Sequence, residues 1–173
     1  DAIVVGSGIS GGWAAKELCE KGLKVMMLGR GKPLQHPDYP TATKDPWDFP
    51  HGGHLTEEDK RRGHIQKRHY SYRGDNKAFY INDLENPYTE EKPFDWIRGY
   101  QVGGKSLTWG RACQRWSEYE FTAPVRYGYG PGWPINYKEI APWYSHVEDF
   151  IGVCGTRDGI EAMPDGEYLP PFD

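Results

Sequence analysis

Residues 2–12 read AIVVGSGISGG, and WAAKELCEKGLKVMML follows over residues 13–28. The apolar run before Gly6 is short and rich in β-branched residues, which is typical of a buried parallel strand. A helix is predicted over residues 10–21, with Gly22 just beyond its end, and a second buried strand over residues 23–28. The sheet-facing side of the predicted helix carries Ala14, Ala15 and Leu18.

Strand, glycine-rich turn, helix and strand within 28 residues form the βαβ layout of a Rossmann-like, dinucleotide-binding α/β fold. In such a turn, Gly6 permits the tight bend, Gly8 lets the backbone approach a pyrophosphate, and Gly11 lets helix and sheet pack closely. The positive end of the helix and its free N–H groups favour phosphates. The sequence therefore predicts a cofactor site that includes Gly6, Ser7, Gly8, Ile9, Ser10 and Gly11.

The end of the second strand leaves the choice of dinucleotide open. Sites for NAD and FAD usually carry Asp or Glu there to hold the adenine ribose, but this chain has Gly29, followed by Arg30. A small residue followed by arginine favours NADP, with Arg30 on the 2′-phosphate. Both positions are candidate cofactor contacts, and the βαβ unit alone is compatible with either cofactor.

The rest of the chain divides by composition into three further regions. The βαβ unit covers residues 1–31, and a proline- and histidine-rich, loop-rich excursion with one short helix over residues 56–67 covers residues 32–97. Residues 98–155 begin with a glycine-rich block and are predicted to contain an amphipathic helix. This helix starts at a capping box of Asn136 and Glu139 and ends near Gly152. Residues 156–173 form an acidic tail that leads toward a substrate domain outside this sequence.

Composition and charge exclude several classes of function. The net charge of −4 gives no reason to expect a nucleic acid or an anionic membrane as partner, and no apolar run is long enough to span a bilayer. The cysteines are widely spaced and read as free thiols rather than a disulfide or metal framework. The pair His51 and His54 lacks a third ligand and is predicted to be a surface feature, so no metal site is expected. His146 is predicted to be a structural or surface residue.

Later motifs carry a resemblance to one enzyme family. They are the double-glycine block RGYQVGGKSLTWGR over residues 98–111, NPY over 86–88, KPFDW over 92–96, RWS over 115–117, WPI over 133–135 and APWY over 141–144. Together with the opening turn, they resemble the glucose–methanol–choline (GMC) family of FAD oxidoreductases. Within it, the chain is most similar to the bacterial sugar-dehydrogenase branch typified by the catalytic subunit of glucoside 3-dehydrogenase, and more distantly to pyranose oxidase.

This resemblance implies that FAD is the cofactor and that the double-glycine block runs beside it. Small residues suit that position because the backbone must come within hydrogen-bonding distance of the cofactor. Thr108 stands where pyranose oxidases carry the histidine that is covalently bonded to flavin, so non-covalent FAD is implied. The further cofactor contacts implied in this way are Val102, Gly103, Gly104, Ser106, Thr108 and Trp109.

The resemblance also implies what this sequence lacks. The family oxidises an alcohol carbon by hydride transfer to flavin, assisted by a histidine base near the C-terminus of a much longer chain. None of the six histidines here matches that base. We therefore expect an N-terminal fragment with no catalytic residue of its own, inactive alone. Loss of an acid at Gly29 is expected to weaken FAD binding by about 1.5–3 kcal/mol unless another group substitutes.

Function and partners follow as expectations from the same resemblance. The leading hypothesis is an FAD-dependent dehydrogenase or oxidase acting on a hydroxyl of a sugar or glycoside. The branch implies a small companion subunit, a cytochrome c electron acceptor and export to the periplasm with the companion's signal, with a cytoplasmic location as the alternative. An NADP-dependent Rossmann dehydrogenase and a degenerate, non-catalytic flavoprotein fragment remain the competing hypotheses.

Overall fold

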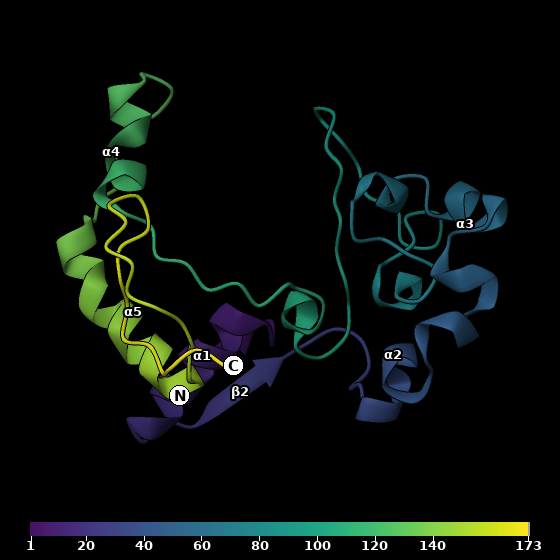
Figure 1. Ribbon diagram of the computed structural model, residues 1–173, viewed down its shortest axis with the longest axis horizontal. Coiled ribbons are helices and arrows are strands. Elements are labelled where there is room, and N and C mark those ends of the chain that lie inside the picture. Colours follow the sequence, from purple (N-terminus) through teal and green to yellow (C-terminus); the bar gives the residue numbers. More distant parts are fainter. Residues whose placement is uncertain (173) are drawn as a thin grey trace. The chain divides into compact units, whose positions relative to one another are not determined.

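The computed structural model describes residues 1–172 as two compact units, divided between Trp109 and Gly110. Asp173, the last residue of the predicted acidic tail, lies outside the described residues. Each unit is described by itself below, and Figure 1 gives the labels of the elements. The segment predicted as one region over residues 98–155 contributes to both units.

The first unit opens with the predicted strand, helix and strand. Strands β1 (Ala2–Val5) and β2 (Val25–Leu28) pair in parallel, with Ala2 opposite Val25, and α1 (Ile9–Glu20) connects them. Gly22 follows the helix with a φ of +83°. The N–H of Gly22 donates to the Cys19 carbonyl at 2.9 Å, and the N–H of Leu23 donates to the Leu18 carbonyl at 3.1 Å. This is a Schellman motif, and it turns the chain from helix to strand.

The prediction of two buried strands was wrong for one face of the sheet. Side chains at Ile3, Val5, Met26 and Leu28 share that face by register, and all four are exposed, Val5 by 82%. The opposite face packs against α1, where Ala15 is buried and Leu18 half-buried, whereas Ala14, also predicted to face the sheet, is exposed. A strand reads as buried from its apolar residues, but a single helix covers only one face of this two-stranded sheet.

Residues 32–97 form a chain of short helical turns without a strand among the described residues. Proline stands in the first turn of several of them, where its missing N–H costs no hydrogen bond. The turns are η1 (His36–Asp38), α2 (Pro40–Thr43), η2 (Pro46–Asp48), η3 (Pro50–Gly53), α3 (Glu57–Arg62), η4 (Gln66–Arg68) and η5 (Lys77–Phe79), and η6 (Gly104–Leu107) follows later.

The helix predicted over residues 56–67 is present but shorter, ending at Gly63. Thr56 and Asp59 form a capping box, and Asp59 also accepts a hydrogen bond from Lys77 at 2.5 Å. The Lys77 ammonium and the bonds from Thr56 hold the pKa of Asp59 down at about 2. The ring of Tyr72 lies so close to Gly63 that a Cβ there would stand 2.5 Å from its hydroxyl, so a larger residue at this helix end would have to displace that ring.

A buried polar cluster holds this excursion together. The guanidinium of Arg98 is 93% buried; it donates to Asp83 at 2.6 Å, to the Asn86 carbonyl at 2.6 Å and to the Tyr100 hydroxyl at 3.1 Å. Burial lowers the pKa of Arg98, but these hydrogen bonds outweigh that effect and raise it. Gln66 donates to the other oxygen of Asp83 at 2.7 Å, so both carboxylate oxygens are paired.

The second unit contains two helices with side-chain caps. The predicted helix is α5 (Tyr137–Ile151), with its capping box at Asn136 and Glu139 and Gly152 as a left-handed C-cap. The helix α4 (Glu118–Arg126) was not predicted, although Ser117 and Glu120 form the same kind of box. Its interior Pro124 and its loop-like surroundings in the sequence conceal that signal.

An ion pair between Arg115 and Glu148 is buried under α5. Two guanidinium nitrogens donate to the two carboxylate oxygens at 2.8 and 2.5 Å, and each side chain is less than 10% exposed. Glu148 also accepts the N–H of Glu167 at 3.0 Å, so it ties the C-terminal segment to the helix. Hydrogen bonds to Glu148 outweigh burial and raise the pKa of Arg115 further above its ordinary value.

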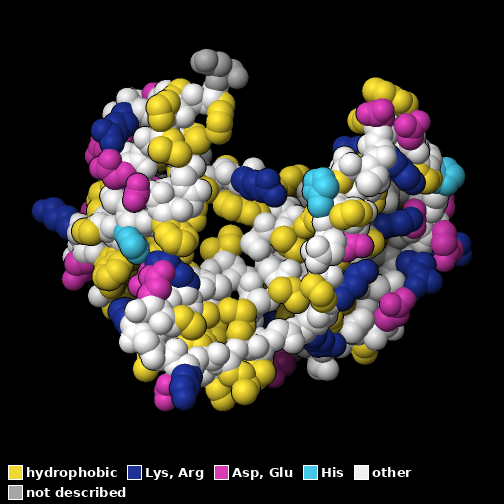
Figure 2. All heavy atoms as spheres, turned by 90° about the horizontal axis from the view of Figure 1, so that it is seen from below, with side chains coloured by type: hydrophobic (Ala, Val, Ile, Leu, Met, Phe, Trp, Pro, Cys, Tyr) yellow, Lys and Arg dark blue, Asp and Glu magenta, His cyan; other side chains and the backbone are white. Residues whose placement is uncertain are grey.

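Large apolar side chains remain exposed in both units, as the yellow patches of Figure 2 show. On α5, Trp143 and Ile151 are 61% and 52% exposed, although their spacing predicted a packed face. Ile140, Tyr144 and Val147 on the same helix are half-buried. The helix is amphipathic, as predicted, but within the described residues its apolar face is only partly covered.

Within residues 1–172, the structure contains no helix that is both long and apolar enough to cross a bilayer.

Replacing Glu148 by glutamine is expected to destabilise the second unit by about 3 kcal/mol, because the buried Arg115 loses its counter-charge. Amide hydrogens of α5 and of Glu167 are expected to exchange roughly 100-fold faster in the variant, as measured by hydrogen–deuterium exchange on the full-length protein. The same substitution at the exposed Glu161 serves as the control. Unchanged exchange in α5 would show that this pair does not stabilise the unit.

Candidate cofactor site

The turn between β1 and α1 has the geometry that its glycines predict. Gly6 adopts a φ of +100°, and its N–H bonds the Leu28 carbonyl at 2.7 Å, which joins the turn to the end of β2. A Cβ on Gly11 would lie 1.9 Å from the Gly6 carbonyl oxygen, so no other residue fits there without a backbone shift. The close packing of helix on strand therefore depends on glycine at this position.

The N-terminus of α1 is open to an anion. Its N-cap is Gly8, which has no side chain to accept a hydrogen bond from the first turn, and that turn contains no acidic residue. The N–H groups of Ile9, Ser10 and Gly11 have no carbonyl partner within the helix. A Cβ on Gly8 would meet no protein atom closer than 3.7 Å, so the backbone there can be approached closely by a ligand.

The double-glycine segment lies against this turn. The N–H of Gly103 donates to the Ser7 hydroxyl at 3.0 Å, and the N–H of Val102 donates to the Lys32 carbonyl at 3.0 Å. Gly104 is close enough to the turn that a Cβ on it would lie 3.8 Å from the Cα of Gly8. Two segments almost a hundred residues apart in the chain are thus joined at one place in the first unit.

Left-handed backbone makes this approach possible. Gly103 and Gly104 have φ values of +91° and +54°, which glycine adopts without a steric penalty. Gly31, at +95°, passes directly against the segment, and a Cβ on it would lie 1.4 Å from the Tyr100 carbonyl oxygen. Arg30 stacks its guanidinium 3.7 Å from the centre of the Tyr100 ring and donates to the Asn86 side chain at 3.2 Å.

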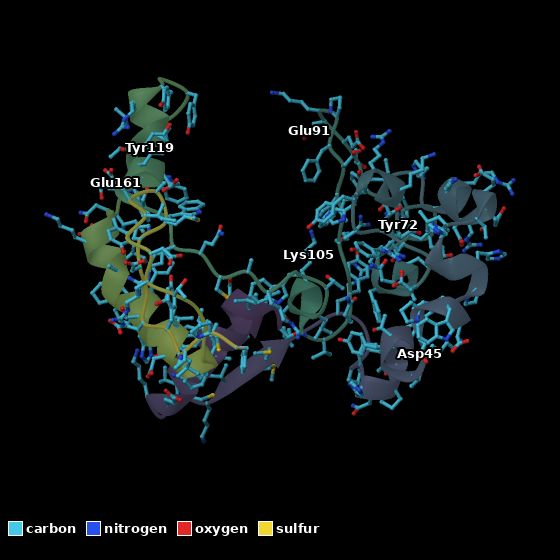
Figure 3. All side chains as sticks on the ribbon, viewed as in Figure 1. Asp45, Tyr72, Glu91, Lys105, Tyr119 and Glu161 are labelled. Atoms are coloured by element: carbon cyan, nitrogen blue, oxygen red, sulfur yellow. The ribbon has the colours of Figure 1, made fainter. Side chains whose placement is uncertain are left out.

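An open pocket of about 380 Å³ lies where the turn and the segment meet. The charge that it contains was missed from the sequence: Lys105, labelled in Figure 3, belongs to the double-glycine block but was not among the predicted cofactor contacts. The ammonium group of Lys105 forms no ion pair within residues 1–172, so its charge is available to an anion. The lining residues are Gly6, Gly8, Ile9, Ser10, Gly11, Lys105, Ser106 and Trp109.

The other predicted contacts surround this pocket without lining it. Ser7 and Gly103 form the hydrogen bond beneath it, and Gly104 packs on Gly8. Val102 is 44% exposed, and the Thr108 hydroxyl donates to the Lys105 carbonyl at 3.4 Å. At the end of β2, a Cβ on Gly29 would meet only the Ser7 hydroxyl, at 3.5 Å, so the position has room for a side chain.

The pocket contains no group suited to act as a catalytic base. None of the six histidines of the sequence lines it. His51 and His54 are exposed at the ends of η3, and the described residues contain no group of three side chains that could hold a metal ion. His146 lies exposed on α5. The uncapped N-terminus of α1 and the Lys105 ammonium group suit the pocket to an anionic ligand.

Comparisons with known proteins add a set of oxidoreductases. The chain is 25% identical over 167 residues to 2-methyl-1,2-propanediol dehydrogenase of Mycolicibacterium austroafricanum, covering 95% of this chain and 26% of that protein. It is 24% identical over 178 residues to the fructose dehydrogenase large subunit of Gluconobacter japonicus, covering 99% and 29%. It is 26% identical over 182 residues to the gluconate 2-dehydrogenase flavoprotein of Pantoea cypripedii, covering 96% and 27%.

These similarities extend over nearly the whole chain, which spans only about a quarter of the length of the curated relatives. The chain matches no protein-family profile. The relatives are dehydrogenases whose names refer to a diol, a sugar and a sugar acid, and one of them is named a flavoprotein. At this level of identity, the similarity is to hydroxyl-oxidising enzymes as a class.

Substituting Gly31 by alanine is expected to displace the double-glycine segment, because the new Cβ would overlap the Tyr100 carbonyl at a φ unfavourable for alanine. The cost is about 2 kcal/mol or more, and hydrogen exchange over residues 101–107 of the full-length protein is expected to accelerate at least tenfold. Gly12→Ala, on α1 with no atom within 4 Å of the new Cβ, is the matched control. Equal protection in both variants would contradict the docking of this segment.

Proposed function

We propose that this chain is the N-terminal, FAD-binding part of an oxidoreductase that oxidises a hydroxyl group of a sugar, a glycoside or a related polyol. The observation that carries the proposal is the junction of the Gly6–Gly11 turn with the double-glycine segment, through the bond from Gly103 to Ser7. The junction creates one pocket with an open helix N-terminus, and Lys105 adds a positive charge to it.

The residues present fit a diphosphate. The uncapped amides of the first turn of α1 supply donors, and the bare backbone at Gly8 allows close approach. Lys105 would neutralise part of the phosphate charge. Ser106 and Trp109 at the same pocket are proposed to lie along the cofactor toward its ring, and Thr108 cannot form a covalent bond to flavin, so FAD would be held non-covalently.

Flavin, when bound, supplies the acceptor for a hydride from the alcohol carbon. The chain's own residues would bind and orient the cofactor, whereas the base that takes the hydroxyl proton would come from the remainder of the protein. That remainder is expected to be long, since the relatives are about four times the length of this chain. We further propose a small companion subunit and a cytochrome c electron acceptor. The name of the fructose dehydrogenase relative, a large subunit, is consistent with a companion.

NADP is the second candidate cofactor, because Gly29 and Arg30 are the pattern that suits a 2′-phosphate. Two observations favour FAD instead. Arg30 is engaged by the Tyr100 ring and the Asn86 side chain, so a 2′-phosphate would have to compete with these partners. The double-glycine segment, which a nicotinamide enzyme does not need, takes up part of the pocket wall. A degenerate, non-catalytic protein is the third hypothesis, and cofactor content distinguishes it.

The full-length protein is expected to purify yellow, with FAD near one per chain. Gly8→Ala is expected to weaken FAD binding at least about tenfold, since a methyl group would stand where the pyrophosphate approaches the backbone. The fold should be retained, because no protein atom lies within 3.7 Å of the new Cβ. Flavin absorbance after gel filtration, with calibrated FAD titration of stripped protein, measures the effect.

Gly12→Ala, four residues along the same helix and away from the pocket, is the control and is expected to retain full flavin. A colourless wild-type protein that binds NADPH would refute the proposal in favour of the NADP enzyme. A colourless protein with no affinity for either dinucleotide would favour the degenerate form.

Gly29→Glu is expected to tighten FAD binding by roughly ten- to hundredfold, because it places a carboxylate where the adenine ribose hydroxyls lie in related folds. The position tolerates a side chain, since its Cβ would contact only the Ser7 hydroxyl. Gly29→Gln is the matched variant of similar size without the charge, and a smaller gain is expected from it. Unchanged FAD affinity in Gly29→Glu would place the ribose elsewhere.

A further inference from the structure

A second pocket, of about 510 Å³, lies beside the cofactor pocket in the first unit, and Lys105 lines both. Its size is within the range of small-molecule sites. Apart from Lys105, the residues of this second pocket that are used below line no part of the cofactor pocket. The residues used below are His69, Phe94, Asp95, Trp96 and Lys105, all of which line this second pocket.

His69 is held in one orientation by its neighbours. The N–H of Ser71 donates to Nδ1 of His69 at 3.3 Å, so Nδ1 carries the lone pair and the ring proton is on Nε2. The Ser71 hydroxyl, 2.8 Å from Nδ1, then donates to the same nitrogen, and the Tyr80 hydroxyl, 2.8 Å from Ser71, completes the chain. Ser71 and Tyr80 thus orient the half-buried imidazole of His69, whose Nε2–H can donate to a ligand.

The remaining polar groups include a cation and an acceptor. Lys105, on the segment that lines the proposed cofactor pocket, contributes an ammonium group (Figure 3). Asp95 pairs with Arg68 through Oδ1, at 2.7 Å, which leaves Oδ2 to accept a hydrogen bond from a ligand. Donors and an acceptor that converge on one space are suited to a ligand with several hydroxyl groups.

The apolar part of this pocket is aromatic. Phe94 is 60% and Trp96 45% exposed, so both rings have surface to offer. Trp96 is held in place by the guanidinium of Arg98, 4.2 Å from its ring centre, and by an edge contact with Tyr88. The electron-rich face of an aromatic ring attracts the C–H bonds on the flat side of a pyranose ring, whereas a small diol has too few such bonds to use it.

We propose that this second pocket binds a sugar ring of the substrate, with Phe94 and Trp96 against its C–H face and with His69, Asp95 and Lys105 on its hydroxyl groups. The inference rests on the proposed function and deepens it, since it selects a sugar or glycoside over a small alcohol. Because Lys105 belongs to both pockets, the sugar would sit directly beside the bound cofactor.

The test uses the full-length protein with its flavin and a dye as electron acceptor. The substrates are methyl α-D-glucopyranoside, methyl β-D-galactopyranoside and D-fructose as sugars, and propane-1,2-diol as the small alcohol. Wild-type protein is expected to oxidise at least one sugar. In His69→Asn, the side-chain amide oxygen can still accept from Ser71 near the position of Nδ1, but the Nε2 donor is lost. This variant is expected to raise KM for that sugar about tenfold.

Phe94→Ala is expected to raise the same KM by about three- to tenfold, and kcat should change by less than about twofold in both variants. His69→Gln, which restores a donor near the Nε2 position, and Phe94→Tyr, which restores the ring, are expected to recover most of the loss. His64→Asn, on an exposed histidine outside this pocket, is the matched control. The KM for propane-1,2-diol should not change in any variant.

Saturation-transfer NMR of the sugars on the same samples gives a measure of binding that does not depend on turnover. Equal loss for sugar and diol, or a wild-type protein that oxidises only the diol, would overturn the sugar site. Flavin absorbance separates the two proposals: a yellow protein whose variants bind sugar as well as the wild type refutes only the sugar site. A protein without flavin refutes the proposed function itself.

Discussion

The hydrogen bond from the N–H of Gly103 to the hydroxyl of Ser7 is the contact on which the candidate site depends. It joins the glycine turn of the βαβ unit to the double-glycine segment, and it lies beneath the pocket that both of them line. Without this bond the half-buried N–H of Gly103 would lack its acceptor, which carries a desolvation cost of about 1–3 kcal/mol. Gly31 adds a steric requirement at the same junction, since only a residue without Cβ passes under Tyr100.

Elsewhere in the chain, buried polar contacts hold neighbouring segments together. Among the described residues few apolar side chains are buried, whereas several polar ones are. The buried polar side chains include Gln66, Asp83, Arg98, Arg115 and Glu148. Each buried charge has a partner: Arg98 meets Asp83, and Arg115 meets Glu148. Such pairs set geometry more than they add stability, because desolvation offsets most of their attraction. Arg98 also contacts the ring of Trp96, which lines the second pocket, and donates to the Tyr100 hydroxyl.

Local sequence signals predicted the local structure well. The turn at Gly6–Gly11, the helix end at Gly22 and the capping box at Asn136 involve residues within a few positions of each other, so their chemistry can be read directly. The short helix after Thr56 was also predicted, but its capping box was not. A position for Gly103 beside the cofactor could be expected only through a family resemblance, and the contact of Gly31 was not predicted. Nothing in the spacing of the residues connects Lys105 to the turn, or His69 to Trp96, because tertiary packing brings these residues together. Burial was the least predictable property, as the exposed face of the sheet shows.

The separation of Ser7 and Gly103 along the chain also has a consequence for biosynthesis. The two strands and α1 lie within residues 2–28, so they can pair as soon as Leu28 has left the ribosome. The Ser7 hydroxyl can bond Gly103 only after 96 further residues have been synthesised. At about 5–20 residues per second, this is a delay of roughly 5–20 s. During that interval the glycine turn of the nascent chain lacks the segment that completes its pocket.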